Sequence, residues 1–130
     1  MSDFYIAFVD DEVDLTEAYQ ELFASKYTIK TFNSAEDYLE FVITQNNRNP
    51  FDVTITDYKM GTMNGIEMII KTMEHDCSRP FILLSGHVDQ ELLKKSIRND
   101  VIVTLVEKPP DIKCLDALIA KILNQKLKTG

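Results

Sequence analysis

The sequence predicts an α/β fold: a doubly wound, five-stranded parallel sheet flanked by five helices. Short apolar runs alternate with segments of helical spacing along the chain, five of each. This alternation is typical of parallel strands joined by helices that cover both faces of one sheet. Several of the runs are apolar nearly throughout, as strands covered on both faces should be. No internal repeat, low-complexity segment or interdomain linker interrupts the pattern.

The strand candidates are short runs rich in β-branched and aromatic residues. They are FYIAFV at 4–9, YTIKTF at 27–32, DVTITD at 52–57, FILLS at 81–85 and VIVTLV at 101–106. The run at 27–32 is the more polar one, which predicts an edge strand. The runs at 4–9, 81–85 and 101–106 are almost continuously apolar, which predicts strands buried on both faces.

The helical segments carry apolar residues three or four positions apart. The stripes are Leu15, Ala18, Tyr19, Leu22 and Phe23; Ile66, Ile69, Ile70 and Met73; and Leu115, Leu118, Ile119 and Ile122. Ser34 followed by Asp37 resembles a capping box and predicts a helix that runs to about Gln45. The segment from Val88 to Ile97 is helical but weakly patterned.

Composition limits the classes of protein that the chain can belong to. Its 130 residues, 45% of them hydrophobic, can bury one good core, so we expect a single domain over residues 1–130. A net charge of −7 without a basic run disfavours direct contact with nucleic acid. Cys77 and Cys114 lack metal-ligand spacing and are expected to be free thiols. No run has transmembrane or signal-peptide character, so we expect a cytoplasmic location without membrane contact.

Chemically reactive residue types stand where the strand runs end. Asp10 and Asp11 follow the first run, Asp57 ends the third, Ser85 ends the fourth and Lys108 follows the fifth. Open α/β sheets bind ligands outside the carboxyl ends of their strands, so we expect these side chains to meet there. Three converging carboxylates raise one another's pKa unless a cation neutralises them, and Mg²⁺ prefers such oxygen ligands.

This combination of groups favours phosphoryl chemistry. A divalent ion, an ammonium and a hydroxyl together suit the charged oxygens of a phosphoryl group, and a carboxylate can act as the nucleophile. Purely structural roles are the alternative. Asp10 and Asp11 could cap the first helix, and Asp57 could end a strand in a turn. Ser85 could satisfy a turn, and Lys108 could be a solvated charge.

Four motifs give the chain a family resemblance. They are VDDE at 9–12, TDYKMGTMNG at 56–65, LLSGH at 83–87 and VEKPP at 106–110. In this order, each at a strand end, they make residues 3 to about 125 similar to the receiver domain of two-component response regulators. The resemblance implies a CheY-like, flavodoxin-like sheet of order 2-1-3-4-5. It also implies a signalling domain rather than an enzyme, one that promotes its own phosphorylation and dephosphorylation.

The resemblance assigns a role to each residue at the strand ends: Asp57 as phosphoacceptor; Asp10, Asp11, Asp57 and the backbone carbonyl of Lys59 as Mg²⁺ ligands; and Ser85 and Lys108 as partners of the phosphoryl oxygens. The phosphodonor would be a sensor histidine kinase or a phosphotransfer protein. The response would pass to an unknown downstream protein or output domain. A cis peptide bond between Lys108 and Pro109 is also implied.

Several positions distinguish this chain within the resemblance. Gly61 stands where the family usually has Pro, which predicts a looser loop after Asp57. Leu105 stands where the family often has Tyr or Phe, which predicts a weaker or different switch on the face of the fourth helix, fifth strand and fifth helix. The side chains of Lys59 and His87 are expected to flank the path of the water that attacks the acyl phosphate.

Three other functions compete with this reading. The first is a degenerate, phosphorylation-independent receiver that acts as a protein-interaction module, which Leu105 keeps open. The second is a phosphatase of the haloacid dehalogenase type, disfavoured because Lys59 occupies the place of its second Asp. The third is a flavin carrier, disfavoured because acids follow the first strand where a phosphate-cradling loop would stand. The sequence leaves open whether the domain is free-standing or part of a larger regulator.

Overall fold

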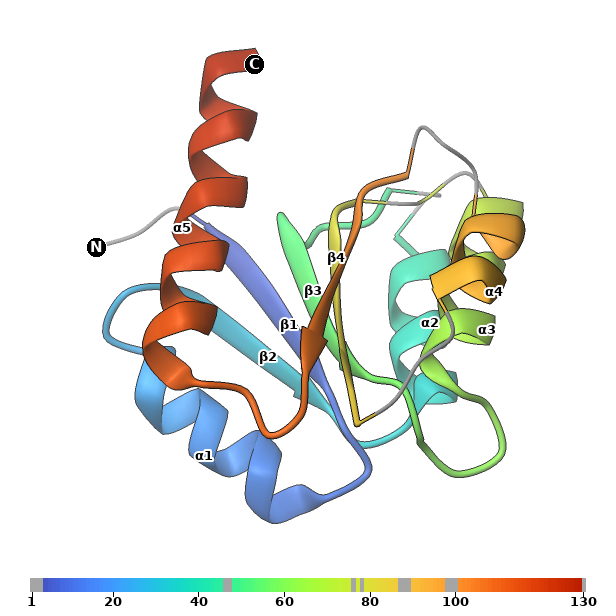
Figure 1. Ribbon diagram of the computed structural model, residues 1–130, viewed down its shortest axis with the longest axis horizontal. Helices are drawn as coiled ribbons and strands as arrows, with labels where there is room; N and C mark the ends of the chain where they lie inside the picture. Colours follow the sequence, from blue (N-terminus) through green and yellow to red (C-terminus); the bar gives the residue numbers. More distant parts are fainter. Residues whose placement is uncertain are drawn as a thin grey trace.

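The computed structural model describes residues 4–45, 48–75, 77, 79–86, 90–97 and 101–129 (Figure 1). Its strands are β1 (Tyr5–Val9), β2 (Thr28–Phe32), β3 (Val53–Asp57), β4 (Phe81–Ser85) and β5 (Val103–Glu107). Its helices are α1 (Val13–Phe23), α2 (Ala35–Ile43), α3 (Gly65–Glu74), α4 (Gln90–Ser96) and α5 (Ile112–Thr129). The strands form one parallel sheet of order β2-β1-β3-β4-β5, which confirms the predicted topology.

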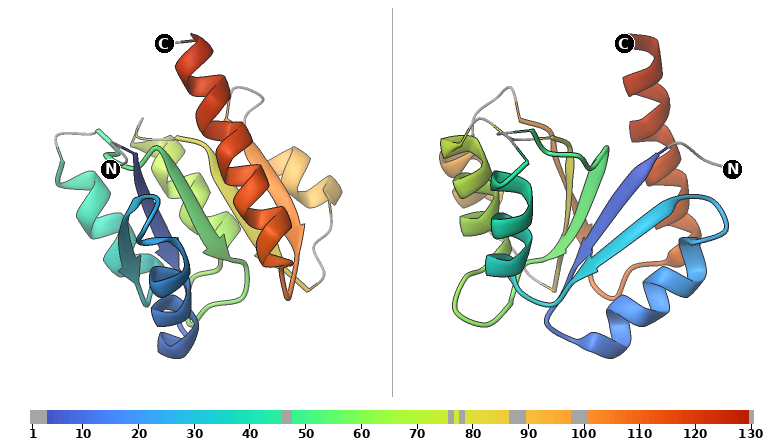
Figure 2. Two further views of the ribbon diagram at one scale, coloured as in Figure 1. Left: turned by 90° about the vertical axis from the view of Figure 1, so that its left-hand side faces the viewer. Right: turned by 180° about the vertical axis from the view of Figure 1, so that it is seen from behind.

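Helices cover both faces of this sheet. Figures 1 and 2 show α1 and α5 on one face and α2, α3 and α4 on the other. Successive residues of a strand point to opposite faces, so Ile6 and Phe8 of β1 pack with α1 and α5, whereas Ala7 and Val9 pack with the other three helices. The two apolar layers hold the sheet in place and leave the ends of its strands for polar groups.

The burial of the strands follows the apolar pattern except at β5 and β3. The edge position of β2 is confirmed. The prediction that the fifth run is buried on both faces is wrong, because β5 is the other edge strand and its residues are half-buried or exposed. Every residue of β3 is buried instead, despite its threonines. The Thr54 hydroxyl shares a hydrogen bond with the Tyr38 hydroxyl, and the Thr56 hydroxyl donates to the Asp57 carbonyl, so neither is buried without a partner.

Three helix starts show whether the residue at the N-cap position makes a capping hydrogen bond. Ser34 caps α2 by accepting the Asp37 backbone N–H, but the returning side-chain bond of a full capping box is absent from the described contacts. A full capping box starts α3, between Asn64 and Glu67. The N-cap of α1 is Glu12, and its side chain makes no cap bond. Asp10 and Asp11 therefore precede the cap of α1.

Two further expectations concern the thiols and the membrane. Both cysteines are free: Cys77 is buried and Cys114 is exposed on α5. In the part of the chain that the structure describes, no helix combines the length and the apolar character needed to span a bilayer.

Candidate functional site

Strand register brings the predicted site residues to one edge of the sheet. Val9 pairs with Thr56 across β1 and β3, so the residues that follow them, Asp10 and Asp57, stand at the same level. Ser85 pairs with Glu107 across β4 and β5, and the Lys108 N–H donates to the Ser85 carbonyl at 2.9 Å. The carboxyl ends of four strands therefore meet with their polar side chains together, as expected for this class of fold.

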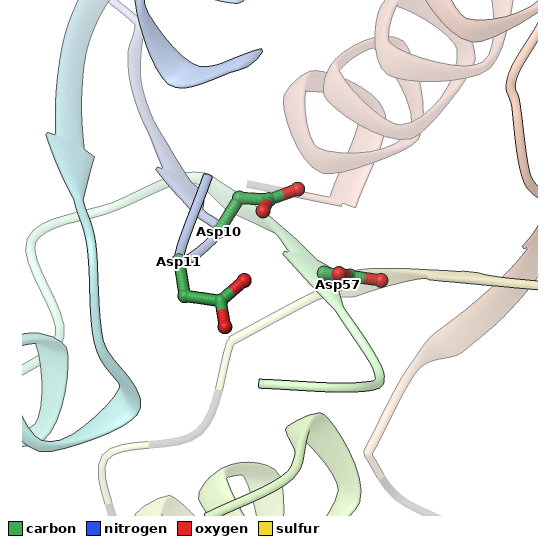
Figure 3. Close-up of side chains that lie close together, drawn as sticks. All are labelled: Asp10, Asp11 and Asp57. Atoms are coloured by element: carbon green, nitrogen blue, oxygen red, sulfur yellow. The ribbon is translucent and has the colours of Figure 1, made fainter. Parts of the chain in front are cut away.

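Three carboxylates form the centre of the site. Asp10 and Asp11 come from the loop after β1 and Asp57 from the end of β3, and their carboxylates face a common space (Figure 3). One carboxylate oxygen from each lies within 4.8 Å of the others. Asp10 and Asp57 are buried, with 2% and 5% of their surface exposed, whereas Asp11 is exposed. Two charged groups are thus held out of water beside a third, which is costly without a cation.

Lys108 is the cation that the structure places beside these acids. Its Nζ donates to Asp57 Oδ2 at 2.9 Å and lies 3.6 Å from Asp10 Oδ2. Burial lowers the pKa of Lys108, but the hydrogen bond to Asp57 and the negative charges of Asp10 and Asp57 outweigh it, so the pKa is raised overall. The side chain is therefore a fixed positive charge at any physiological pH. The peptide bond from Lys108 to Pro109 is cis, which confirms that prediction.

Asp10 is held firmly by its backbone and by one of its two oxygens. Oδ1 accepts the Glu12 N–H at 2.9 Å, and the Asn33 side chain donates to the Asp10 carbonyl at 3.0 Å. Oδ2 is buried and has no hydrogen-bond partner among the described residues, since Lys108 lies beyond hydrogen-bond distance. Burial, chiefly, raises the pKa of this carboxyl; the Glu12 N–H lowers it and the charge of Asp57 raises it.

A cavity of about 540 Å³ opens over Asp57. Its lining also includes Glu12, Tyr58, Lys59, Ser85, Gly86 and Lys108. Lys59 is exposed at this rim and forms no ion pair with a described residue. The cavity gives Asp57 access to a ligand of small-molecule size. His87, predicted to flank the same path, lies outside the described residues.

Sequence reasoning gave no role to three residues that shape the site. Glu12, which the sequence showed only as the last residue of the motif VDDE, lines the cavity. Asn33 bridges the Asp10 carbonyl and the Thr16 hydroxyl, and its place after the β2 run was the available signal. Gly65 packs so closely against β3 that an added Cβ would lie 2.6 Å from the Asp57 carbonyl oxygen, a contact that no sequence pattern reveals.

The donor set fits a hard divalent cation. All three acidic groups offer oxygen, which Mg²⁺ and Ca²⁺ prefer over nitrogen or sulfur ligands. The buried Asp10 Oδ2 points to the same conclusion, because Lys108 Nζ lies 3.6 Å away and no described residue donates a hydrogen bond to this oxygen. Lys108 supplies one positive charge beside three carboxylates, so a divalent ion would come close to balancing the site.

Residues 6–120 match the protein family described as the response regulator receiver domain. The chain belongs to this family. Receiver domains are signalling domains of two-component systems rather than enzymes of the usual kind, and the family generally binds Mg²⁺ at an acidic pocket. The predicted resemblance is therefore confirmed.

Individual relatives agree with this family. The chain is 26% identical over 110 residues to the transcriptional regulatory protein FixJ of Rhizobium meliloti, covering 84% of this chain and 52% of FixJ. It is 31% identical over 93 residues to the two-component response regulator ARR10 of Arabidopsis thaliana, covering 70% of this chain and 16% of ARR10. This receiver domain thus spans about half of FixJ and a smaller part of ARR10.

Solved structures share the fold. A response regulator receiver domain protein from Clostridium thermocellum has a TM-score of 0.80 to this structure, with 22% sequence identity. The similarity covers 98% of this chain and 99% of that one. The whole receiver fold, and not a part of it, is therefore present here.

Proposed function

We propose that this receiver domain is a phosphorylation-dependent switch that accepts a phosphoryl group on Asp57 in a Mg²⁺-dependent reaction. The single observation that supports it best is the placement of Asp57. Its carboxylate is buried at the end of β3, lies under an open cavity, and sits between two further acids and the ammonium of Lys108. A carboxylate with an access route and neighbouring positive charge has what an acceptor of a phosphoryl group requires.

Each residue of the site has a distinct part in this proposal. Asp10, Asp11 and Asp57, with the Lys59 backbone carbonyl, would hold Mg²⁺, which when bound neutralises the carboxylates and the charge on phosphoryl oxygens. A carboxylate oxygen of Asp57 forms the new bond to phosphorus, while the bond between phosphorus and the donor breaks. The distance of 2.9 Å between Lys108 Nζ and Asp57 Oδ2 supports the proposed pairing of this ammonium with an oxygen of the arriving phosphoryl group.

The phosphodonor in this proposal is a sensor histidine kinase or a phosphotransfer protein, and the site assists both transfer and later hydrolysis. The proposed location is the cytoplasm, where the ATP that such kinases use is made. The response would go to a downstream protein or an output domain. We propose that residues 1–130 act as a single receiver unit in this exchange.

Signalling would follow from the new charge. A phosphoryl group adds negative charge and strong acceptors, which draws hydroxyl and ammonium donors toward it. Ser85 and Lys108 are two of the hydroxyl and ammonium donors that line the cavity, and Ser85 is the last residue of β4. Movement there would be transmitted to β5 and the adjoining helices. Leu105 of β5 is half-buried and packs against the core shared by α2, α3 and α4, so this face has an aliphatic side chain where the family often has Tyr or Phe.

Leu105 is also the observation that favours a second candidate, a degenerate receiver that binds its partner without phosphorylation. An aliphatic side chain of this size has no hydroxyl and less area to exchange between an inward and an outward position. In that case the domain would bind its partner with the same affinity in both states of Asp57.

Mass spectrometry after incubation with Mg²⁺ and a small phosphodonor such as acetyl phosphate tests the proposal. We expect one added phosphate on the native chain, none on Asp57→Asn, and an undiminished amount on Asp14→Asn, a matched change at an exposed acid of α1. Omitting Mg²⁺ or adding EDTA should prevent the addition. Equal labelling of Asp57→Asn and Asp14→Asn would refute Asp57 as the acceptor, and no labelling of the native chain would favour the degenerate receiver.

A further inference from the structure

The loop between β3 and α3, residues 58–64, is closed at its base and tethered at its tip. At the base, the Gly65 N–H donates to the Tyr58 carbonyl at 2.8 Å. At the tip, the Gly61 N–H donates to Asp11 Oδ2 at 3.3 Å, and the Thr62 hydroxyl donates to Glu36 Oε2 at 2.5 Å. The tip therefore connects the loop after β1 with the start of α2.

The Gly61 contact depends on the residue type at this position. Proline, which the family resemblance led us to expect here, has no backbone N–H and could not donate to Asp11. Space does not explain the glycine, because an added Cβ would meet nothing within 4 Å and the backbone is outside the left-handed region. The distinguishing property of position 61 is thus its N–H group, which is directed at one of the three clustered carboxylates.

The Thr62 contact gives the tip a rigid anchor. Glu36 lies in the first turn of α2, and Ser34 caps that turn by accepting the Asp37 N–H at 3.0 Å. The hydrogen bond from Thr62 lowers the pKa of the Glu36 carboxyl, so the acceptor is ionised and the bond is charge-assisted. A chain of contacts thus runs from a capped helix through Thr62 and Gly61 to the Asp11 carboxylate.

We propose that the Gly61 N–H and the Thr62–Glu36 hydrogen bond are positioning contacts that orient Asp11 toward the bound divalent ion. This inference rests on the proposed function, in which Asp11 is an Mg²⁺ ligand. Hydrogen bonds to ligating carboxylates fix their orientation and strengthen metal binding. Each carboxylate oxygen has more than one lone pair, so Oδ2 can accept the Gly61 N–H and leave capacity for a cation. The two bonds replace the stiffness that a proline would give the loop.

Calorimetric titration with Mg²⁺ of the native chain, Gly61→Ala and Gly61→Pro tests the first contact. Alanine keeps the N–H in open space, so we expect native affinity, whereas proline removes the donor and should weaken binding by roughly tenfold. Equal affinities for the two variants, or tighter binding by Gly61→Pro, would overturn the inference. Absence of binding by the native chain would instead count against the proposed function, so the two failures are distinguishable.

The second contact is tested independently, which keeps the inference open to refutation if Gly61→Pro does not fold. Thr62→Val removes the hydroxyl at constant shape and should weaken Mg²⁺ binding about threefold, while Thr62→Ser restores the donor and should restore the affinity. Unfolding midpoints in EDTA should be alike for both, since both residues at this contact are exposed. Native affinity in Thr62→Val would overturn the tether.

A spectroscopic measurement separates positioning from a general structural role. The chain has 4 glycines, so the resonance that Gly61→Ala removes from a ¹H–¹⁵N spectrum identifies the Gly61 amide. We expect this amide to shift on Mg²⁺ titration in the native chain and to shift with the same midpoint as the calorimetric curve. An amide that does not respond to saturating Mg²⁺ would overturn the Asp11 contact as part of the site.

Discussion

At the amino-terminal end of the sheet, buried and half-buried polar groups are matched with one another, whereas at the carboxyl-terminal end the acids outnumber their described partners. Near the starts of β1 and β3, Asp52 accepts the Tyr5 N–H at 2.8 Å and pairs with Arg79 at 3.3 Å. The buried Tyr38 hydroxyl accepts from the Asn49 amide at 2.9 Å and shares a hydrogen bond with Thr54. In this network one acid faces one cation, and the neutral groups satisfy each other.

At the opposite end, three carboxylates share Lys108, and the buried Asp10 Oδ2 has no hydrogen-bond partner in the described part of the chain. The same strands thus carry a closed polar network at one end and an incomplete one at the other. Buried charges that are left incomplete cost stability, and proteins retain them where a ligand completes the set. The comparison therefore separates a structural end of the sheet from the end that carries the proposed site.

The largest expected effect on stability comes from the close approach of Gly65 to the end of β3, next to Asp57. Gly65→Ala would place a Cβ 2.6 Å from the Asp57 carbonyl oxygen and 2.7 Å from Leu83 Cδ1. Because neither the sheet backbone nor a buried side chain can move freely, we expect the free energy of unfolding to fall by about 3 kcal/mol. Urea denaturation measures it. Gly86→Ala, with open space around the new Cβ, is the control and should stay within about 0.5 kcal/mol of the native value.

Loss of one hydroxyl should weaken the hydrogen-bond network at the amino-terminal end of the sheet. Tyr38→Phe removes the hydroxyl that joins Asn49 and Thr54, leaving two buried polar groups without that partner. We expect a loss of about 2 kcal/mol in the free energy of unfolding. Tyr27→Phe, at a half-buried tyrosine with no side-chain hydrogen bond in the described structure, should cost less than about 0.5 kcal/mol. Equal costs at both sites would mean that the network does not stabilise the fold.

An Asp→Asn substitution should change the free energy of unfolding in opposite directions at the two ends of the sheet. In EDTA at pH 7, Asp10→Asn removes a buried charge and should raise the free energy of unfolding by about 1 kcal/mol. Asp52→Asn weakens the pair with Arg79 and leaves one oxygen to serve two donors, so it should lower stability by about 1 kcal/mol. Added Mg²⁺ should stabilise the native chain and Asp52→Asn more than Asp10→Asn. Changes of equal sign in EDTA would abolish the distinction between the ends.

The smallest expected effect is the pH dependence of the stability gain that Asp10→Asn gives over the native chain in EDTA. Burial raises the pKa of Asp10 in the folded chain above its ordinary value of about 4, so the folded state binds this proton more readily than the unfolded state. The penalty is therefore complete above the folded pKa and is relieved as pH falls to the unfolded pKa. In EDTA, the advantage of Asp10→Asn should shrink from neutral pH toward pH of about 4. A stability gain of Asp10→Asn that grows on acidification would contradict a raised pKa of Asp10 in the folded chain.

The residues of the candidate site could be predicted from the sequence because each of them is marked by its position at the end of a strand. Asp10, Asp57, Ser85 and Lys108 each stand at a strand end, and parallel strands place these ends at one edge. Their roles in binding and transfer remain predictions. The assignment of burial went wrong at β5, because a strand's apolar content does not tell whether it has one neighbour or two. Boundaries also shifted: the fifth strand begins at Val103 and α2 ends at Ile43.

By itself, the sequence determined the alternation of strands and helices, the polar edge strand β2 and the acids at the strand ends, because these follow from periodicity and spacing along the chain. Only the tertiary structure decided that β5 is half-buried rather than fully covered, that Asp10 Oδ2 is buried without a hydrogen bond from any described residue, and that the Gly61 N–H reaches Asp11. The physical reason is that burial and hydrogen-bond satisfaction depend on groups far apart in sequence, whose meeting no local pattern encodes.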